Sequence, residues 1–131
     1  MADYTIKHLE EVDDVLGDYP GEMRMMTAAL EAEQVAFTYR RMPQHTGGKG
    51  SYGHRHKTQE EVYFVMSGKL QFKLGDEVLD LERGSVVRVP PETWRSVWND
   101  EPGDAELVIV SKRVDGGSAE DAEYQESFWP E

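Results

Sequence analysis

The chain of 131 residues carries 26 acidic against 14 basic side chains, a formal net charge of -12, and 38% of its residues are hydrophobic. This length and content fit one domain spanning residues 1–131, and the negative charge disfavours binding to nucleic acid or to an anionic membrane. The chain has no cysteine, which excludes disulfide and thiolate chemistry. No stretch resembles a signal peptide or reaches the length of a membrane span, so we expect a cytoplasmic protein.

The N-terminal part of the chain predicts an extension followed by the first strand of a sheet. The extension covers residues 1–33; its first twenty residues mix charges with scattered apolar positions, and a short helix is expected at about residues 8–16. From Met23 onward the hydrophobic period becomes two. Val35, Phe37 and Tyr39 share one face, and Ala36, Thr38 and Arg40 share the other. This alternation predicts a half-buried strand.

The remainder of the chain repeats short apolar segments separated by turn signals. Further strands are expected at residues 61–67, 70–74, 78–81, 85–89, 94–99 and 106–113. A hairpin turn is expected at Gly75-Asp76, and the prolines at 90 and 91 end the strand before them. We therefore expect an all-β sandwich or barrel, with the barrel at about residues 34–112.

The tail, residues 113–131, is polar but carries Tyr124, Phe128 and Trp129. We expect these aromatic side chains to attach the tail to the surface of the domain or to a partner subunit, rather than to bind a cofactor.

The segment GHRHKTQEE, residues 53–61, contains a candidate metal site. Residues two apart on a strand point to the same face, so His54 and His56 present two imidazoles side by side. With residues 57–60 as a turn, Glu61 opens the next antiparallel strand and faces the same pair. Two neutral imidazoles and a carboxylate suit Zn, Fe, Mn, Ni or Cu.

Glycines at fixed distances from this pair extend the pattern, which resembles the first motif of the cupin superfamily. That motif is a glycine, five residues, His-x-His, three or four residues, a glutamate, six residues and a glycine. Gly48, His54, His56, Glu61 and Gly68 match each fixed position. The resemblance implies a small double-stranded β-helix, or jelly-roll barrel, and it selects Glu61 over Glu60 as the ligand.

The second cupin motif is matched only in part. The segment GSVVRVPPETWRSVWN supplies Gly84, Pro90 and Asn99 in register. Glu92 stands where the family has a glycine, and Arg95 stands where the family has its fourth metal-binding histidine. The resemblance therefore implies the barrel with only three of the four ligands.

Arg95 leaves three arrangements open. An arginine cannot coordinate a cation, and at about 4 Å from a divalent ion the repulsion is roughly 8 kcal/mol at an effective dielectric of ~20. Arg95 either swings aside and leaves a two-histidine, one-carboxylate site, or holds an anionic substrate beside the metal. In the third arrangement no metal binds, and Arg95 pairs with Glu61.

Two main functions follow from these arrangements. The first is a divalent-metal-dependent enzyme of oxygenase, isomerase or lyase type, acting on a small anionic molecule held by Arg95, with Tyr63 and Tyr39 as further substrate-binding candidates. The second is a metal-free cupin that binds or senses a small molecule. A weaker third is metal-free acid–base catalysis with Tyr63 as the acid. The resemblance also implies a homodimer.

Overall fold

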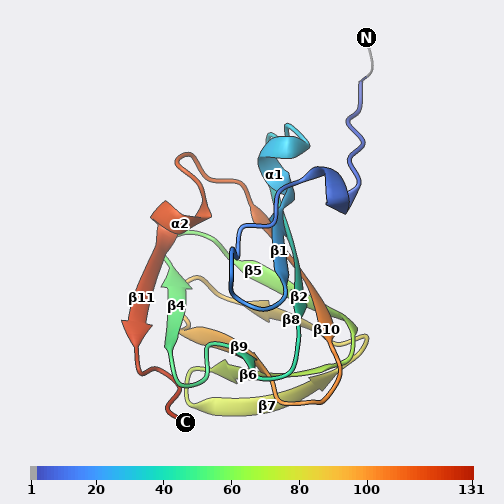
Figure 1. Ribbon diagram of the computed structural model, residues 1–131. Coiled ribbons are helices and arrows are strands. Elements are labelled where there is room, and N and C mark those ends of the chain that lie inside the picture. Colours follow the sequence, from blue (N-terminus) through green and yellow to red (C-terminus); the bar gives the residue numbers. More distant parts are fainter. Residues whose placement is uncertain (1–2) are drawn as a thin grey trace.

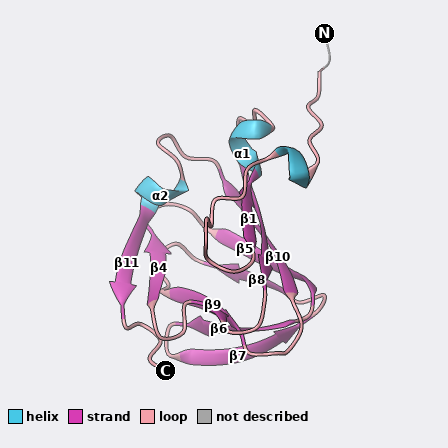
Figure 2. Cartoon of the chain, viewed as in Figure 1, coloured by secondary structure: helices cyan, strands magenta, loops and turns pink. Residues whose placement is uncertain are grey.

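The computed structural model describes residues 3–131, and most of these residues lie in short antiparallel strands or the loops between them (Figure 2). Within this range none of the helices has the length and apolar character needed to cross a membrane. The strands form two sheets that face each other, as Figure 1 shows. This arrangement is the double-stranded β-helix expected from the sequence.

The first sheet has the order β1-β2-β10-β5-β8. Its strands are β1 (Glu22–Met25), β2 (Val35–Met42), β10 (Ala105–Lys112), β5 (Glu61–Ser67) and β8 (Val86–Val89). A helix of four residues, α1 (Met26–Ala29), joins β1 to β2.

The second sheet has the order β11-β4-β9-β6-β7, with β3 paired to β9. Its strands are β11 (Ala122–Glu126), β4 (Tyr52–His56), β9 (Arg95–Asn99), β6 (Lys69–Leu74), β7 (Glu77–Glu82) and β3 (Thr46–Gly47). The expected hairpin is confirmed, because Leu74 pairs with Glu77 across the turn at Gly75-Asp76.

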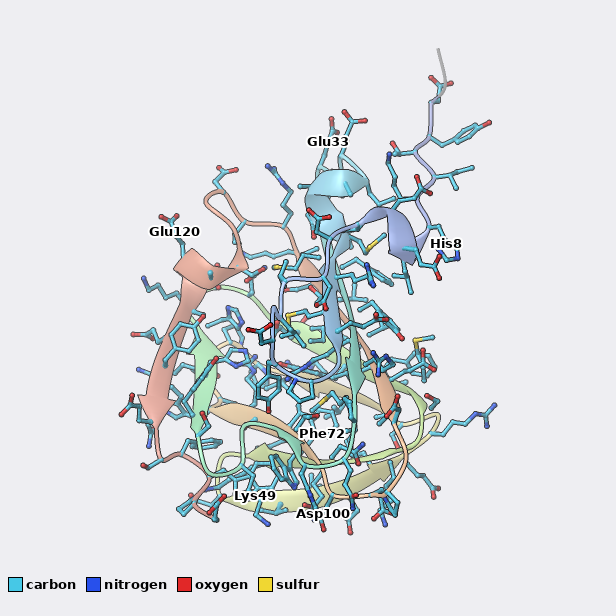
Figure 3. All side chains as sticks on the ribbon, viewed as in Figure 1. His8, Glu33, Lys49, Phe72, Asp100 and Glu120 are labelled. Carbon is cyan, nitrogen blue, oxygen red and sulfur yellow. The ribbon has the colours of Figure 1, made fainter. Side chains whose placement is uncertain are left out.

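The core lies between the two sheets, where the inward side chains of both meet. Figure 3 labels Phe72, which lies between the sheets and packs edge-to-face against Tyr63 with ring centroids 5.5 Å apart. The buried core consists of Met42, Tyr63, Val65, Leu70, Phe72, Val89, Val97, Ala105 and Leu107. These side chains fill the space between the sheets, and Tyr63 among them reaches Glu61 at the candidate site.

The ends of the chain differ from expectation in two ways. The helix expected at residues 8–16 is wrong: only a 3-10 turn, η1 (Leu9–Glu11), forms, and the chain is already extended at Val12. The tail forms a short helix, α2 (Ser118–Asp121), followed by β11, which pairs with β4 at one edge of the second sheet (Figure 1). The polar composition of this segment gave no strand signal.

Two of the three tail aromatics attach the tail to the domain. Phe128 and Trp129 are buried, whereas Tyr124 is largely exposed. The Phe128 ring lies 6.4 Å from the Trp94 ring, and the Lys73 ammonium sits 4.5 Å above it. The tail is therefore held on the outer face of β4, β9 and β6.

Candidate metal centre

Two neighbouring strand ends bring the three predicted ligands together. His54 and His56 project from the same face of β4, and Glu61 is the first residue of β5. Nε2 of His54 lies 3.5 Å from Oε1 of Glu61, and Nε2 of His56 lies 3.4 Å from the same oxygen. All three ligand atoms lie within 4.8 Å of one another.

The two nitrogen–oxygen separations fit a single divalent ion. Ligands at about 2.0–2.2 Å from one ion, at angles between ~90° and ~110°, are roughly 3.0–3.5 Å apart. The site is reached by solvent from one side, since the His54 side chain is 29% exposed while that of His56 is 3% exposed. Two ligands are thus fixed in the wall of the barrel, and the third borders its opening.

The tail supplies a further carboxylate behind His56. Oδ2 of Asp121, the last residue of α2, lies 3.2 Å from Nδ1 of His56. Asp121 also accepts hydrogen bonds from the Thr58 amide and hydroxyl and from the Gln59 amide. These donors fix the carboxylate. Burial alone would raise the pKa of Asp121, but the hydrogen bonds from Thr58 and Gln59 and the contact with His56 outweigh it. The pKa of Asp121 therefore lies below its ordinary value.

The contact with Asp121 determines which nitrogen of His56 is free. When Nδ1–H donates to Asp121, the neutral ring presents the lone pair of Nε2 to the Glu61 carboxylate. Among the residues described, this buried Nε2 has no hydrogen-bond partner. Two acceptors then face each other at 3.4 Å, an arrangement that requires a proton or a cation between them. A carboxylate behind a histidine is also the usual support of a metal ligand.

Tyr63 completes the surroundings of Glu61. The Tyr63 hydroxyl donates to Oε1 of Glu61 at 2.6 Å. Burial alone would raise the pKa of Glu61, but the contacts with His54, His56 and Tyr63 outweigh it and hold the pKa well below its usual range. Burial and the Glu61 charge raise the pKa of Tyr63, so the phenol keeps its proton. Glu61 is therefore a carboxylate and Tyr63 a neutral donor.

Arg95 lies at the position expected from the second motif but faces mostly away from the ligands. It starts β9, pairs with His54 and is fully buried. Nη1 donates to the carbonyls of Pro91 and Thr93, at 3.1 and 2.9 Å, and Nη2 donates to that of Pro90 at 3.3 Å. Only Nε faces the site, 3.4 Å from Oε1 of Glu61.

Arg95 thus combines two of the arrangements left open by the sequence. Its terminal nitrogens are turned aside onto backbone carbonyls, and its Nε forms an ion pair with Glu61, although Nε has no hydrogen-bond partner within residues 3–131. The carbonyl dipoles and the Glu61 charge both offset the guanidinium charge. A substrate contact through Arg95 stays a prediction, and it is confined to the Nε side.

The structure brings Tyr63 to the site but not Tyr39. Tyr39 pairs with Val108 on the face of the first sheet that looks away from the core, and its hydroxyl donates to Oε2 of Glu106 at 2.6 Å. With Phe37, Met66 and other residues it lines a separate apolar pocket of about 330 Å³. Tyr39 is buried there because the N-terminal extension covers this face.

The structure explains one match and one departure in the second motif, Asn99 and Glu92. Asn99 is fully buried, and its amide donates to the carbonyls of Met42 and Gly103 at 2.7 and 2.8 Å, so it holds the loop after β9. Glu92 is exposed and is absent from the non-glycine residues with positive φ, so the turn does not need the family's glycine there. The structural residues Pro90 and Asn99 of the motif are present, whereas the position of the family's fourth metal ligand carries Arg95.

The fold and the ligand set together define a small barrel with a candidate His-His-Glu metal site. The family model described as "Cupin domain", Cupin_2, matches residues 41–111. This chain therefore belongs to the Cupin_2 family, as the resemblance in its motifs predicted.

The similar solved structures share the fold, and the similar proteins carry diverse names. Uncharacterized protein MJ1618 of Methanocaldococcus jannaschii is 30% identical over 73 residues, which cover 56% of this chain and 57% of that protein. The chain thus spans little more than half of this curated relative. Among solved structures, a cupin protein (BF4112) from Bacteroides fragilis matches with a TM-score of 0.69, 17% identity and 88% coverage of both chains. A predicted oxalate decarboxylase (tm1287) from Thermotoga maritima matches with a TM-score of 0.66 and 18% identity, over 83% of this chain and 99% of that one.

Proposed function

We propose that this protein binds one divalent metal ion through His54, His56 and Glu61 and uses it to bind a small anionic molecule, as a metal-dependent enzyme. The observation that carries the proposal is the buried Nε2 of His56, which faces Glu61 without a hydrogen-bond partner in the described chain while Asp121 lies behind Nδ1. Iron, manganese, nickel and zinc all suit this donor set.

The charges around the site favour an anionic ligand. A divalent ion, the Glu61 carboxylate, the Asp121 carboxylate behind His56 and the Arg95 guanidinium sum to a net charge of about +1 at the site. This charge stands out in a chain whose formal net charge is -12. An anion that enters from the His54 side therefore meets a local positive potential.

Each protein group has a defined task in this proposal. A bound ion would supply Lewis acidity toward a substrate oxygen, which suits oxygenase, isomerase and lyase reactions alike. Asp121 would keep Nε2 of His56 directed at the ion, and the Tyr63 hydroxyl donates a hydrogen bond to Oε1 of Glu61. The relative named a predicted oxalate decarboxylase has a similar fold, which is compatible with a small acid as the ligand.

The test is an isothermal calorimetric titration of metal-free protein with zinc, manganese, nickel and iron(II). We expect one equivalent of at least one metal to bind. His54→Ala, His56→Ala and Glu61→Gln should each weaken binding about 100-fold or more. His45→Ala is the matched control, because its side chain is 64% exposed and not part of the ligand cluster. Failure of every metal to bind would contradict the proposal.

A metal-free binding or sensing module is the second candidate, and the ion pair between Arg95 and Glu61 favours it. In that case Glu61 is already neutralised by the guanidinium, and the wild-type protein binds no metal. Arg95→His would then create metal binding where none existed. The titration above separates the two candidates.

The homodimer and the cytoplasmic location expected from the sequence stay predictions. Light scattering of purified protein tests the first, with twice the 14.9 kDa chain mass as the expected result. A mass of one chain would contradict it.

A further inference from the structure

A second arginine lies on the inner face of the barrel. Arg40 of β2 pairs directly with Leu107 of β10, which in turn pairs with Val65 of β5. Leu107 and Val65 are both fully buried in the core between the sheets. Directly paired residues of an antiparallel sheet project to the same side, so Arg40 projects into the barrel, opposite in direction to Tyr39.

Arg40 differs from Arg95 in that it forms no ion pair within residues 3–131. Its Nε is buried and has no hydrogen-bond partner within residues 3–131. The arginine ion pairs of this range involve Arg24, Arg41, Arg55, Arg88, Arg95 and Arg113, not Arg40. Arg40 is half-buried, and without an acidic partner in residues 3–131 its guanidinium is available to an anion.

The register places Arg40 and Tyr63 on the same face of the first sheet. Thr38, two residues before Arg40, pairs with Ile109 of β10, which pairs with Tyr63 of β5. Tyr63 is the residue that donates to Glu61. Arg40 therefore projects from the same inner face as the residue that contacts a candidate ligand.

Aromatic groups lie beside His54, the partly exposed ligand. Tyr52 lies on the same face of β4 as His54, and the Tyr52 ring packs edge-to-face on the exposed Tyr124 of β11. From the N-terminal extension, the Tyr19 hydroxyl accepts from the Gly47 amide at 2.9 Å. This hydrogen bond ties the segment before β1 to β3 of the other sheet.

We propose that Arg40 binds the carboxylate of a small dicarboxylic or oxo-acid ligand whose other end lies at His54, His56 and Glu61. The guanidinium offers a planar fork that matches a carboxylate with two parallel hydrogen bonds. Arg40 is aligned with Val65, so it lies two strands across the sheet and four residues along it from Glu61, roughly 16 Å between Cα atoms. The extended Arg40 side chain covers part of this distance and a short two-headed acid spans the rest. The inference rests on the proposed function for the metal-bound end only.

The test uses succinate and malonate as probes, with succinamide as the uncharged control, in both zinc-loaded and metal-free protein. Calorimetry gives the affinity of each form at fixed salt. The Nε–H resonance of Arg40 in ¹⁵N NMR spectra, assigned by its loss in Arg40→Lys, reports contact at the guanidinium itself. Arg41→Gln is the matched control, because Arg41 is the adjacent residue on the outer face, paired with Asp104.

We expect a probe to bind wild type saturably and to shift the Arg40 Nε–H resonance. Arg40→Gln should weaken binding roughly 10- to 100-fold, as loss of a charged hydrogen-bond donor does, and Arg40→Lys should lie between. Arg41→Gln should bind like wild type. Should Arg40→Gln not fold, Arg40→Lys and the resonance shift in wild type still decide the question.

Two results would overturn the inference: wild type that binds neither probe below about 10 mM, or Arg40→Gln that binds as tightly as wild type. The two proposals fail separately. Succinate binding through Arg40 in protein that takes up no metal would leave this inference standing and remove the metal centre. Zinc binding with no Arg40-dependent succinate binding would leave the metal centre standing and remove the inference about Arg40.

Discussion

Oδ2 of Asp121 lies 3.2 Å from Nδ1 of His56, and this contact joins the C-terminal tail to the inside of the barrel. The tail is thus more than a surface attachment, because it sets the tautomer and direction of a candidate metal ligand. Since Asp121 ends α2 just before β11 pairs with β4, the strand pairing positions the carboxylate.

Asp121→Asn should weaken metal binding about 10- to 100-fold, because loss of a carboxylate behind a metal-ligating histidine has effects of this size. Calorimetric titration with the metal that wild type binds most tightly measures the effect. Glu123→Gln is the control, since Glu123 lies on β11 but pairs with the exposed Arg55. Equal metal affinity in Asp121→Asn and wild type would show that Asp121 only holds the loop at Thr58 and Gln59.

Arg95→His should tighten metal binding at least tenfold, because the new imidazole stands at the position of the family's fourth ligand. It should also make the metal-free protein less stable, since the carbonyls of Pro90, Pro91 and Thr93 lose their donor. The added metal should therefore raise the melting temperature more in Arg95→His than in wild type. Identical metal affinities in the two proteins would be inconsistent with Arg95 standing at a ligand position.

Gly53→Ala should destabilise the fold by about 1–3 kcal/mol through overpacking. A Cβ at Gly53 would lie 2.8 Å from Cγ of Phe128 and 2.9 Å from the Arg95 carbonyl, so either the tail or β9 must move. Urea denaturation followed by tryptophan fluorescence measures the change, as Trp94 lies beside Phe128. Gly103→Ala, where a Cβ meets no atom within 4 Å, should be close to neutral. Equal stability of both variants would mean that Phe128 does not pack on β4.

The Asp14 carboxylate should titrate below 3.8, its ordinary value, because it accepts hydrogen bonds from the Leu16 and Met23 amides. A lowered pKa means that its contribution to stability is complete above about pH 4 and is lost as the pH falls through the folded-state value. The difference in unfolding free energy between wild type and Asp14→Ala should therefore be larger at pH 6 than at pH 3. A carboxyl carbon NMR titration with a midpoint at or above 3.8 would contradict this.

The sequence predicted the barrel and the ligand triad because both depend on short-range pattern. Alternation of apolar residues marks strands, and His54, His56 and Glu61 are close in the chain as well as in space. Asp121 lies 65 residues from His56. It was out of reach because the strand that follows it, AEYQE, is polar and mostly exposed and so lacks the apolar alternation.

The face assignments show where alternation stops being informative. It separates Tyr39 from Arg40 correctly, but it does not tell which of the two faces the core. The N-terminal extension covers the outer face of the first sheet and buries Tyr39 there, so both faces are partly buried. The arginine, not the tyrosine, projects inward, and burial pattern alone would have favoured the reverse.

X-ray absorption spectroscopy of the metal-loaded protein tests the central claim most directly. We predict two imidazole nitrogens and at least one carboxylate oxygen at about 2.0–2.2 Å from the ion, with one imidazole lost in His56→Ala and no change in His45→Ala. A metal-loaded spectrum without imidazole scattering, or one that is the same in wild type and His56→Ala, would contradict a metal centre at His54, His56 and Glu61.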